Sequence, residues 1–120
     1  MDKILMTQKA QQQIQKVING PAKLLLSYND GVGPFSSVGS CSIGTDFDIL
    51  AVVPNEKDDD YTAQLSSALG TIYYKGYSAR YLDQDLKLSV GSFNQLQLSG
   101  QSGMIDGSVR IIDERGQNNG

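Results

Sequence analysis

The feature that most constrains the fold is a long glycine-rich loop between two apolar segments. The segments at 22–28 and 47–53 are predicted strands, and the loop at 29–44 joins them. It contains the only cysteine, four of the thirteen glycines and one of the three prolines. Hairpin loops usually have about 2–5 residues, so this loop is long for a simple connection. A loop held between two buried strands is a common place for a functional site.

Length and cysteine content set the broad class of the protein. A chain of 120 residues has the size of one domain, which we expect over residues 1–115 with a flexible tail at 116–120. One cysteine allows no intramolecular disulfide, so nothing indicates an oxidising compartment. No segment approaches the ~20 apolar residues of a membrane span. We therefore expect a soluble, cytoplasmic protein.

Charge and the absence of histidine exclude several functions. The net charge is −3 and no basic run is present, so the electrostatic pattern of a nucleic-acid-binding protein is missing. Without histidine the chain can form neither a Ser-His-Asp nor a Cys-His catalytic arrangement. Zinc sites that use histidine are excluded for the same reason. We expect a protein that is not an enzyme.

One amphipathic helix is predicted over residues 8–18. Ala10, Ile14, Val17 and Ile18 recur at the spacing of one helical face. Thr7 is the expected N-cap, and the 19–21 segment Asn-Gly-Pro is typical of a helix end.

The remaining segments predict a β-rich α+β domain. Alternating or β-branched runs indicate further short strands, and a short helix is expected at 76–82. With the two strands beside the loop, the expected strands lie at 4–6, 22–28, 47–53, 61–66, 71–74, 86–90, 95–99 and 109–112. The last of these is expected at a sheet edge. Seven or eight short strands with one long helix indicate a mainly antiparallel architecture.

Cys41 is the first candidate for chemistry, and the local sequence leaves its role open. Small residues at 39–44 would let a ligand approach the backbone, which favours a metal or cluster thiolate. The simpler interpretation, which local sequence alone favours, is a buried structural cysteine. No lysine or arginine lies between Lys23 and Lys57, whereas four acidic residues do. The lack of a cation nearby in sequence weakens a nucleophilic role, and the acidic surround is more compatible with attracting a metal cation.

Other patterns have simpler explanations than a site. The Gly-rich stretch at 31–36 lacks the third glycine of a dinucleotide-binding loop, and no helix pattern follows it. The acidic run at 54–60 lacks the ligand spacing of a calcium loop and is expected to be a solvated turn. Four tyrosines at 73–81 are expected to pack a strand against the short helix, and an Asp-Gln-Asp turn at 83–85 is expected on the surface.

With these features in order, the chain resembles the HesB-like, A-type iron–sulfur cluster biosynthesis family, and in particular a divergent branch found in lactobacilli and related Gram-positive bacteria. The resemblance covers residues 3–112 in overall pattern. Five segments carry it. They are the helix end at Asn-Gly (19–20), the apolar strand that enters the cysteine loop (24–41), the strand with its acidic segment (46–60), the short helix that ends in Leu-Asp (76–83) and the last hairpin (86–98). It implies a β-rich pseudobarrel of short strands with an N-terminal helix and a short second helix.

The resemblance also implies a function and its ligands. Family members carry or assemble iron–sulfur clusters or bind iron, usually as dimers or higher oligomers, through a loop cysteine and a C-terminal Cys-Gly-Cys. The loop cysteine corresponds to Cys41, whereas the C-terminal region at 101–108 has no cysteine. A [2Fe–2S] cluster ordinarily takes four thiolates, and a symmetric dimer here would offer two. The resemblance therefore implies iron or a labile cluster whose other ligands come from oxygen donors such as Asp106, a small thiol or a partner protein.

Two other hypotheses about the function remain. The first is an interaction module that kept the scaffold and lost the metal. The second, a thiol enzyme, is the least favoured because the chain has no histidine and no cation close to Cys41 in sequence. Expected partners are a second copy of the chain and iron–sulfur assembly or recipient proteins, with neither nucleic acid nor membrane.

Overall fold

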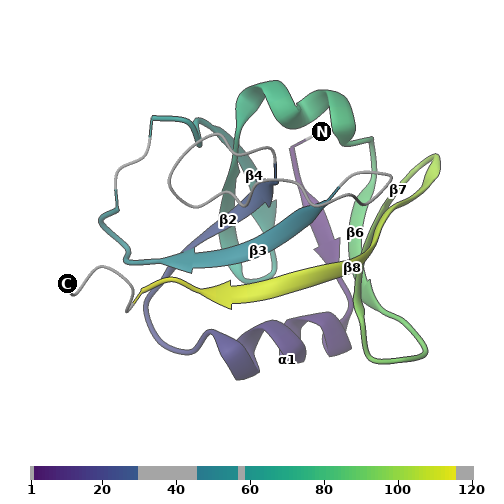
Figure 1. The fold of residues 1–120 in the computed structure, drawn as a ribbon, viewed down its shortest axis with the longest axis horizontal. Helices are drawn as coiled ribbons and strands as arrows, with labels where there is room; N and C mark the ends of the chain where they lie inside the picture. Colours follow the sequence, from purple (N-terminus) through teal and green to yellow (C-terminus); the bar gives the residue numbers. More distant parts are fainter. Residues whose placement is uncertain (1, 30–45, 57–58, 116–120) are drawn as a thin grey trace.

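The computed structural model describes residues 2–29, 46–56 and 59–115. Their secondary structure consists of eight strands, one α-helix and one 3-10 helix (Figure 1). In chain order these are β1 Ile4–Met6, α1 Gln8–Val17, β2 Lys23–Tyr28, β3 Phe47–Val52, β4 Ala63–Ser67, β5 Gly70–Tyr74, η1 Gly76–Tyr81, β6 Leu86–Val90, β7 Leu96–Gly100 and β8 Gly103–Asp113. The β-rich α+β fold expected from the sequence is confirmed.

All eight strands belong to one sheet, in the order β1-β6-β7-β8-β3-β2-β5-β4. Within the described ranges, four neighbouring pairs are antiparallel and three are parallel. The two outer strands approach each other through a bridge between Lys3 and Ser66, and the Ser66 N–H donates to the Asp2 carbonyl at 2.9 Å. This contact nearly closes the sheet into a barrel, as the expected pseudobarrel requires. Figure 1 shows α1 and η1 at opposite sides of it.

Helix α1 forms where the apolar spacing predicts it. Its N-cap is Thr7, whose hydroxyl accepts the Ala10 N–H at 3.2 Å. Ala10 and Ile14 are buried and Ile18 continues the apolar stripe beyond the helix, but Val17 is 43% exposed. The expectation that Val17 faces the core was wrong because it lies at the margin of a stripe centred near Ile14. The chain then turns at Gly20, whose φ of +77° is favourable for glycine.

The last strand differs most from expectation. The segment 109–112 was expected at an edge, but β8 has eleven residues and lies between β7 and β3. Its first part pairs antiparallel with β7, and residues 110–113 pair parallel with β3. Two register shifts accompany the change of partner. Glycines and polar residues interrupt the alternation of apolar residues in the first part of this strand, so the sequence pattern indicates only its last part.

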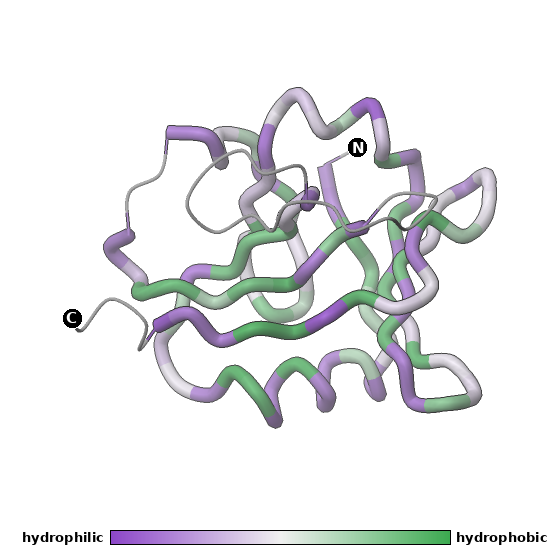
Figure 2. The backbone as a smooth tube through the Cα atoms, viewed as in Figure 1, coloured by the Kyte–Doolittle hydropathy of each residue, from purple (hydrophilic) through white to green (hydrophobic). Residues whose placement is uncertain are grey.

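Strands β2 and β3 are apolar on both faces. Alternate residues such as Leu24, Leu26 and Ile49 join the main core inside the barrel. Leu25 and Leu50, which point the other way, pack with Val52 and Tyr61 in a second cluster. Figure 2 shows the corresponding hydrophobic colouring along the central strands. A strand buried on both faces gives a rigid support for the segment that connects β2 to β3.

Candidate functional site

Cys41 lies outside the described residues, as does the Gly-rich stretch at 31–36. The structure describes the two sides of the connection that carries this cysteine. The Asn29 N–H donates to the Asp46 carbonyl at 2.9 Å, which continues the β2–β3 ladder by one rung. We call this pair of residues the neck. Any site on residues 30–45 is therefore supported by what holds Asn29 and Asp46.

Asp106 reaches the first residue of β3 from the part of β8 that pairs with β7. Asp106 is 9% exposed, and one of its carboxylate oxygens accepts the Phe47 N–H at 2.8 Å. The other oxygen accepts the Ser108 N–H at 2.9 Å, an aspartate turn that the Asp-Gly-Ser sequence favours. The residue expected from the sequence as an oxygen donor thus lies beside the first residue of β3. Both oxygens already accept backbone hydrogen bonds, while a carboxylate has about four acceptor positions in all.

A second carboxylate, Asp48, connects β8 to the neck. Arg110 is its neighbour in the β3–β8 register and donates to it from Nε at 3.0 Å and from Nη2 at 2.8 Å. The Asn29 side-chain amide donates to the same carboxylate at 3.0 Å. Asp48 is 2% exposed, whereas the Arg110 side chain is 57% exposed. The hydrogen bonds and charge of Asp48 raise the pKa of Arg110, and Asp46 adds a smaller electrostatic contribution.

Lys75 is a fully buried cation on the other side of β2. Its ammonium donates to the Tyr28 carbonyl at 3.0 Å and lies 5.6 Å from the centre of the Tyr61 ring. The Tyr61 hydroxyl in turn shares a hydrogen bond with Ser27 at 2.7 Å. Register explains the placement, because Leu26 pairs with the residue that precedes Lys75. Buried Asp48, Ser27 and Lys75 therefore lie along one row across the sheet near the neck.

Sequence reasoning missed this row because its members are far apart along the chain. Arg110 is 62 positions from Asp48, and Lys75 is 47 positions from Tyr28. The loop sequence contains no lysine or arginine, yet folding brings Arg110 and Lys75 to residues of β3 and β2 next to it. One signal was available: Asp48 lies between Phe47 and Ile49 in a strand predicted beside the loop, and a carboxylate that is buried in such a strand requires a partner.

The tyrosines expected to pack in the core divide into two groups. Tyr74 is buried at 6% exposure, whereas Tyr77 and Tyr81 on η1 are 49% and 39% exposed. The expectation of core packing was therefore wrong for the two on η1. Tyr81 instead stacks on Tyr28, with ring centres 4.5 Å apart, and Tyr28 lies 5.4 Å from the Phe47 ring. The aromatic contact thus joins η1 to the last residue of β2.

The other acidic candidates do not form a metal site in the described ranges. Asp83 accepts the Ser102 and Gln84 N–H groups, both at 2.7 Å, and these hydrogen bonds lower its pKa. It therefore supports the β7–β8 turn, while Asp85 is exposed with a φ of 55°. Two residues of the acidic run, 57–58, lie outside the description. Elsewhere along the described chain, no three Cys, Asp or Glu side chains gather closely enough to hold a metal ion.

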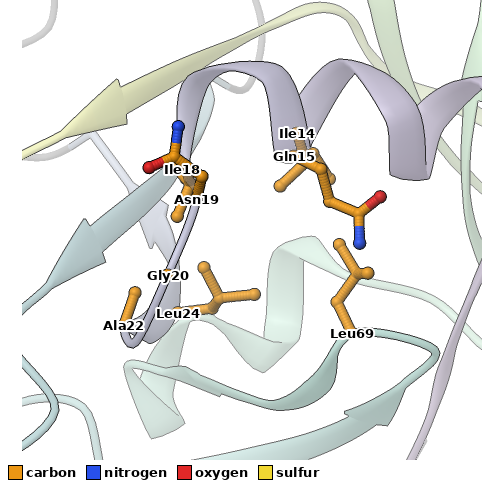
Figure 3. Close-up of a pocket in the computed structure, with 8 residues that line it drawn as sticks. All are labelled: Ile14, Gln15, Ile18, Asn19, Gly20, Ala22, Leu24 and Leu69. Atoms are coloured by element: carbon orange, nitrogen blue, oxygen red, sulfur yellow. The ribbon is translucent and has the colours of Figure 1, made fainter.

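A cavity of about 300 Å³ lies between the end of α1 and the β4–β5 turn (Figure 3). Its walls combine aliphatic side chains with two amides: Ile14, Gln15, Ile18, Asn19, Gly20, Ala22, Leu24 and Leu69. Leu24 is near the start of β2, whereas the neck follows its last residue. The cavity is therefore separate from the supports of the Cys41 segment.

Comparison with known proteins identifies the family. Residues 2–113 match the family model described as "Iron-sulphur cluster biosynthesis". The chain belongs to this family. The match covers nearly the whole sequence, so the resemblance expected from the loop, the short helix and the last hairpin is confirmed.

Two crystal structures of lactobacillar proteins share the fold of this iron–sulphur cluster biosynthesis family member. One is a proposed Fe-S biosynthesis protein from Lactobacillus salivarius, described as having a novel fold, with 38% identity and a TM-score of 0.81. The similarity covers 94% of this chain and 98% of that one. The other, from Lactobacillus acidophilus, has 23% identity and a TM-score of 0.72 over 92% and 89% of the two chains, and supports the fold alone. A search of curated proteins gave no match.

The family assignment directs attention to the segment that corresponds to the family's C-terminal cysteines. The segment at 101–108, which stands where the resemblance expects a Cys-Gly-Cys, forms the β7–β8 turn and the first part of β8. Asp106 is the residue of this segment that contacts the start of β3. None of the described helices is both long and apolar enough to cross a membrane.

Proposed function

We propose that this protein takes part in iron–sulfur cluster biosynthesis by binding iron or a labile [2Fe–2S] cluster as cargo through Cys41. The observation that supports this most directly is the Asp106–Phe47 hydrogen bond of 2.8 Å. It joins β8, from the segment that replaces the C-terminal cysteines, to the strand that follows the cysteine-bearing connection. The segment that replaces the C-terminal cysteines therefore contacts the strand that follows the cysteine-bearing connection.

The ligand set explains why the proposed cargo is labile. One thiolate per chain is too few for a cluster that ordinarily takes four. Asp106 is the proposed protein oxygen donor, although it must share its carboxylate with the Phe47 and Ser108 N–H groups. Hard oxygen donors suit a cluster less well than thiolates do. The remaining ligands would come from a second copy of the chain, a small thiol, or an assembly or recipient protein. The proposed location of the protein is the cytoplasm.

A second candidate function is an interaction module that has lost the metal. It is favoured by the absence of the Cys-Gly-Cys and by the backbone hydrogen bonds that already engage both Asp106 oxygens. In this case the same scaffold would bind assembly proteins without a thiolate. The two functions differ in whether Cys41 is needed.

Anaerobic reconstitution with iron and sulfide, followed by desalting, tests the proposal. We expect wild-type protein to retain iron and Cys41→Ser to lose most of it. Asp106→Asn should reduce retention, whereas Asp83→Asn, a carboxylate that also accepts two backbone N–H groups, should not. Equally negligible retention by wild type and Cys41→Ser would reject iron binding. Recovery of the same partner proteins with Cys41→Ala would then support the interaction module.

A further inference from the structure

We propose that Asn19 is a site of spontaneous covalent modification, at which the side-chain amide is lost and an aspartate or isoaspartate residue is formed. The site is the turn between α1 and β2, and every residue of this turn is described. The reaction belongs to the protein chain itself, so neither iron nor residues 30–45 take part in it. It is therefore independent of the proposed function.

The reaction is an intramolecular acyl transfer that needs only water. The Gly20 backbone nitrogen loses its proton and attacks Cγ of the Asn19 side chain. The bond between this nitrogen and Cγ forms, the bond between Cγ and Nδ2 breaks, and the amide leaves as ammonia with one proton taken up. Water then opens the succinimide ring. Addition at Cγ gives aspartate, and addition at the main-chain carbonyl carbon gives isoaspartate, whose backbone runs through Cγ.

The local structure of the turn favours this attack. Asn19 is exposed and lies beyond α1, whose C-cap is Ile18. Among the described residues, neither the Gly20 N–H nor the Asn19 side-chain amide has a hydrogen-bond partner. Glycine also has no side chain that would shield its nitrogen from the neighbouring Cγ. The nucleophile and its target are thus adjacent, accessible to water and not engaged elsewhere.

Arg115 assists the reaction electrostatically. Its Nη1 donates to the main-chain carbonyl oxygen of Asn19, which belongs to the same peptide group as the attacking nitrogen. When the Gly20 nitrogen loses its proton, amide resonance places part of the negative charge on this oxygen. A guanidinium hydrogen bond stabilises such a charge, as the donors of an oxyanion hole do.

The other charges near the turn leave this role to Arg115. Asp113 binds the guanidinium through Nε and Nη2, at 2.9 and 2.8 Å, so that Nη1 is directed at the turn. The C-terminal end of α1 carries partial negative charge, which opposes an anion, and Lys16 in the last helical turn offsets it. Arg115 is the cation that contacts the reacting peptide group.

The modification would change the cavity beside the turn. Asn19 and Gly20 both line this cavity, and none of its lining residues is charged (Figure 3). Aspartate or isoaspartate would introduce a carboxylate into the wall. Isoaspartate would also lengthen the backbone of the turn by a methylene group.

Peptide mapping by mass spectrometry tests the site in the intact, folded protein. The chain is kept in mildly alkaline buffer, and the conversion of each asparagine is followed with time. We expect Asn19 to convert about tenfold faster than Asn55 and Asn94, which are also exposed but precede glutamate and glutamine. Equal rates at the three asparagines would overturn the proposal.

Two arginine variants test the electrostatic assistance. Arg115→Gln should slow the conversion of Asn19 by about threefold. Arg80→Gln is the matched control and should leave the rate unchanged, because this exposed arginine lies on η1, on the opposite side of the barrel from α1 (Figure 1). In urea, where the turn is lost, wild type and Arg115→Gln should convert equally fast. An unchanged or faster rate in folded Arg115→Gln, or a difference that persists in urea, would overturn the role of Arg115.

Discussion

The side chains of two arginines near the C-terminal end of β8 each donate two hydrogen bonds to a carboxylate, yet they support different regions. Arg110 binds Asp48, which is almost fully buried and also holds Asn29. Arg115 binds the partly exposed Asp113, two residues away, and donates to the carbonyls of Asn19 and Pro21. The first pair holds the neck of the cysteine-bearing connection, and the second holds the turn between α1 and β2.

The difference lies in which partner is buried. In the first pair the carboxylate is buried and the Arg110 side chain is 57% exposed, so loss of the arginine would leave a buried charge. In the second pair the carboxylate is 33% exposed and remains accessible to water. Breaking a buried pair by removing one partner costs far more than breaking an exposed one. Loss of the arginine should therefore lower the free energy of unfolding more at the neck than at the turn between α1 and β2.

The largest effect is expected from comparing Arg110→Gln with Arg115→Gln. The first should lower the free energy of unfolding by about 2 kcal/mol, because it leaves the Asp48 carboxylate buried without its cation. The second should lower it less. Urea unfolding at neutral pH measures both values. Equal losses would remove the distinction between the two pairs.

Asp106→Ala should have the next largest effect. It leaves the buried Phe47 N–H without its acceptor, which costs about 1–2 kcal/mol. Asp106→Asn should recover part of this, because its carbonyl oxygen still accepts one hydrogen bond. Asp83→Ala is the control, since its Ser102 and Gln84 N–H donors are exposed. Thermal and urea unfolding should rank Asp106→Ala below Asp83→Ala in stability; the reverse order would contradict the role of Asp106 at the start of β3.

Gly20→Ala tests whether the two regions are independent. A residue with a side chain is strained at the φ of +77° found here, so we expect a loss of about 1 kcal/mol. Exchange of the Asn29 N–H relative to Leu24–Leu26 should stay as in wild type. A selective rise at Asn29 would show that the α1–β2 turn and the neck are coupled.

The smallest effect is a pH dependence at the turn. Hydrogen bonds from the Arg115 side chain and backbone lower the pKa of Asp113 to about 2. Because the folded-state pKa is below the unfolded value of about 3.9, the stabilisation is complete above that value. It is lost as the pH falls toward 2. The stability difference between wild type and Asp113→Asn should thus be constant from pH 7 to about 5 and shrink below about 4. A difference that grows on acidification would contradict this sign.

The sequence predicted the elements whose pattern is local. The periodicity of 8–18, the apolar runs on both sides of the cysteine loop and the last hairpin needed no information from distant residues. The long β8 was missed because its glycines and its change of partner break the alternation. Asp48–Arg110 and Lys75–Tyr28 depend on which strands become neighbours, and no local pattern encodes that. The contacts that support the candidate site could therefore be identified only from the order of the strands in the sheet.

The most direct test of the account is the sulfur-to-iron charge-transfer absorption of protein reconstituted anaerobically with iron and sulfide. Wild-type protein should show this absorption with iron retained after desalting, and Cys41→Ser should show neither. Asp113→Asn, far from the neck, should match wild type. An absence of both absorption and iron in wild type, or equal signals in wild type and Cys41→Ser, would contradict the claim that Cys41 binds the cargo.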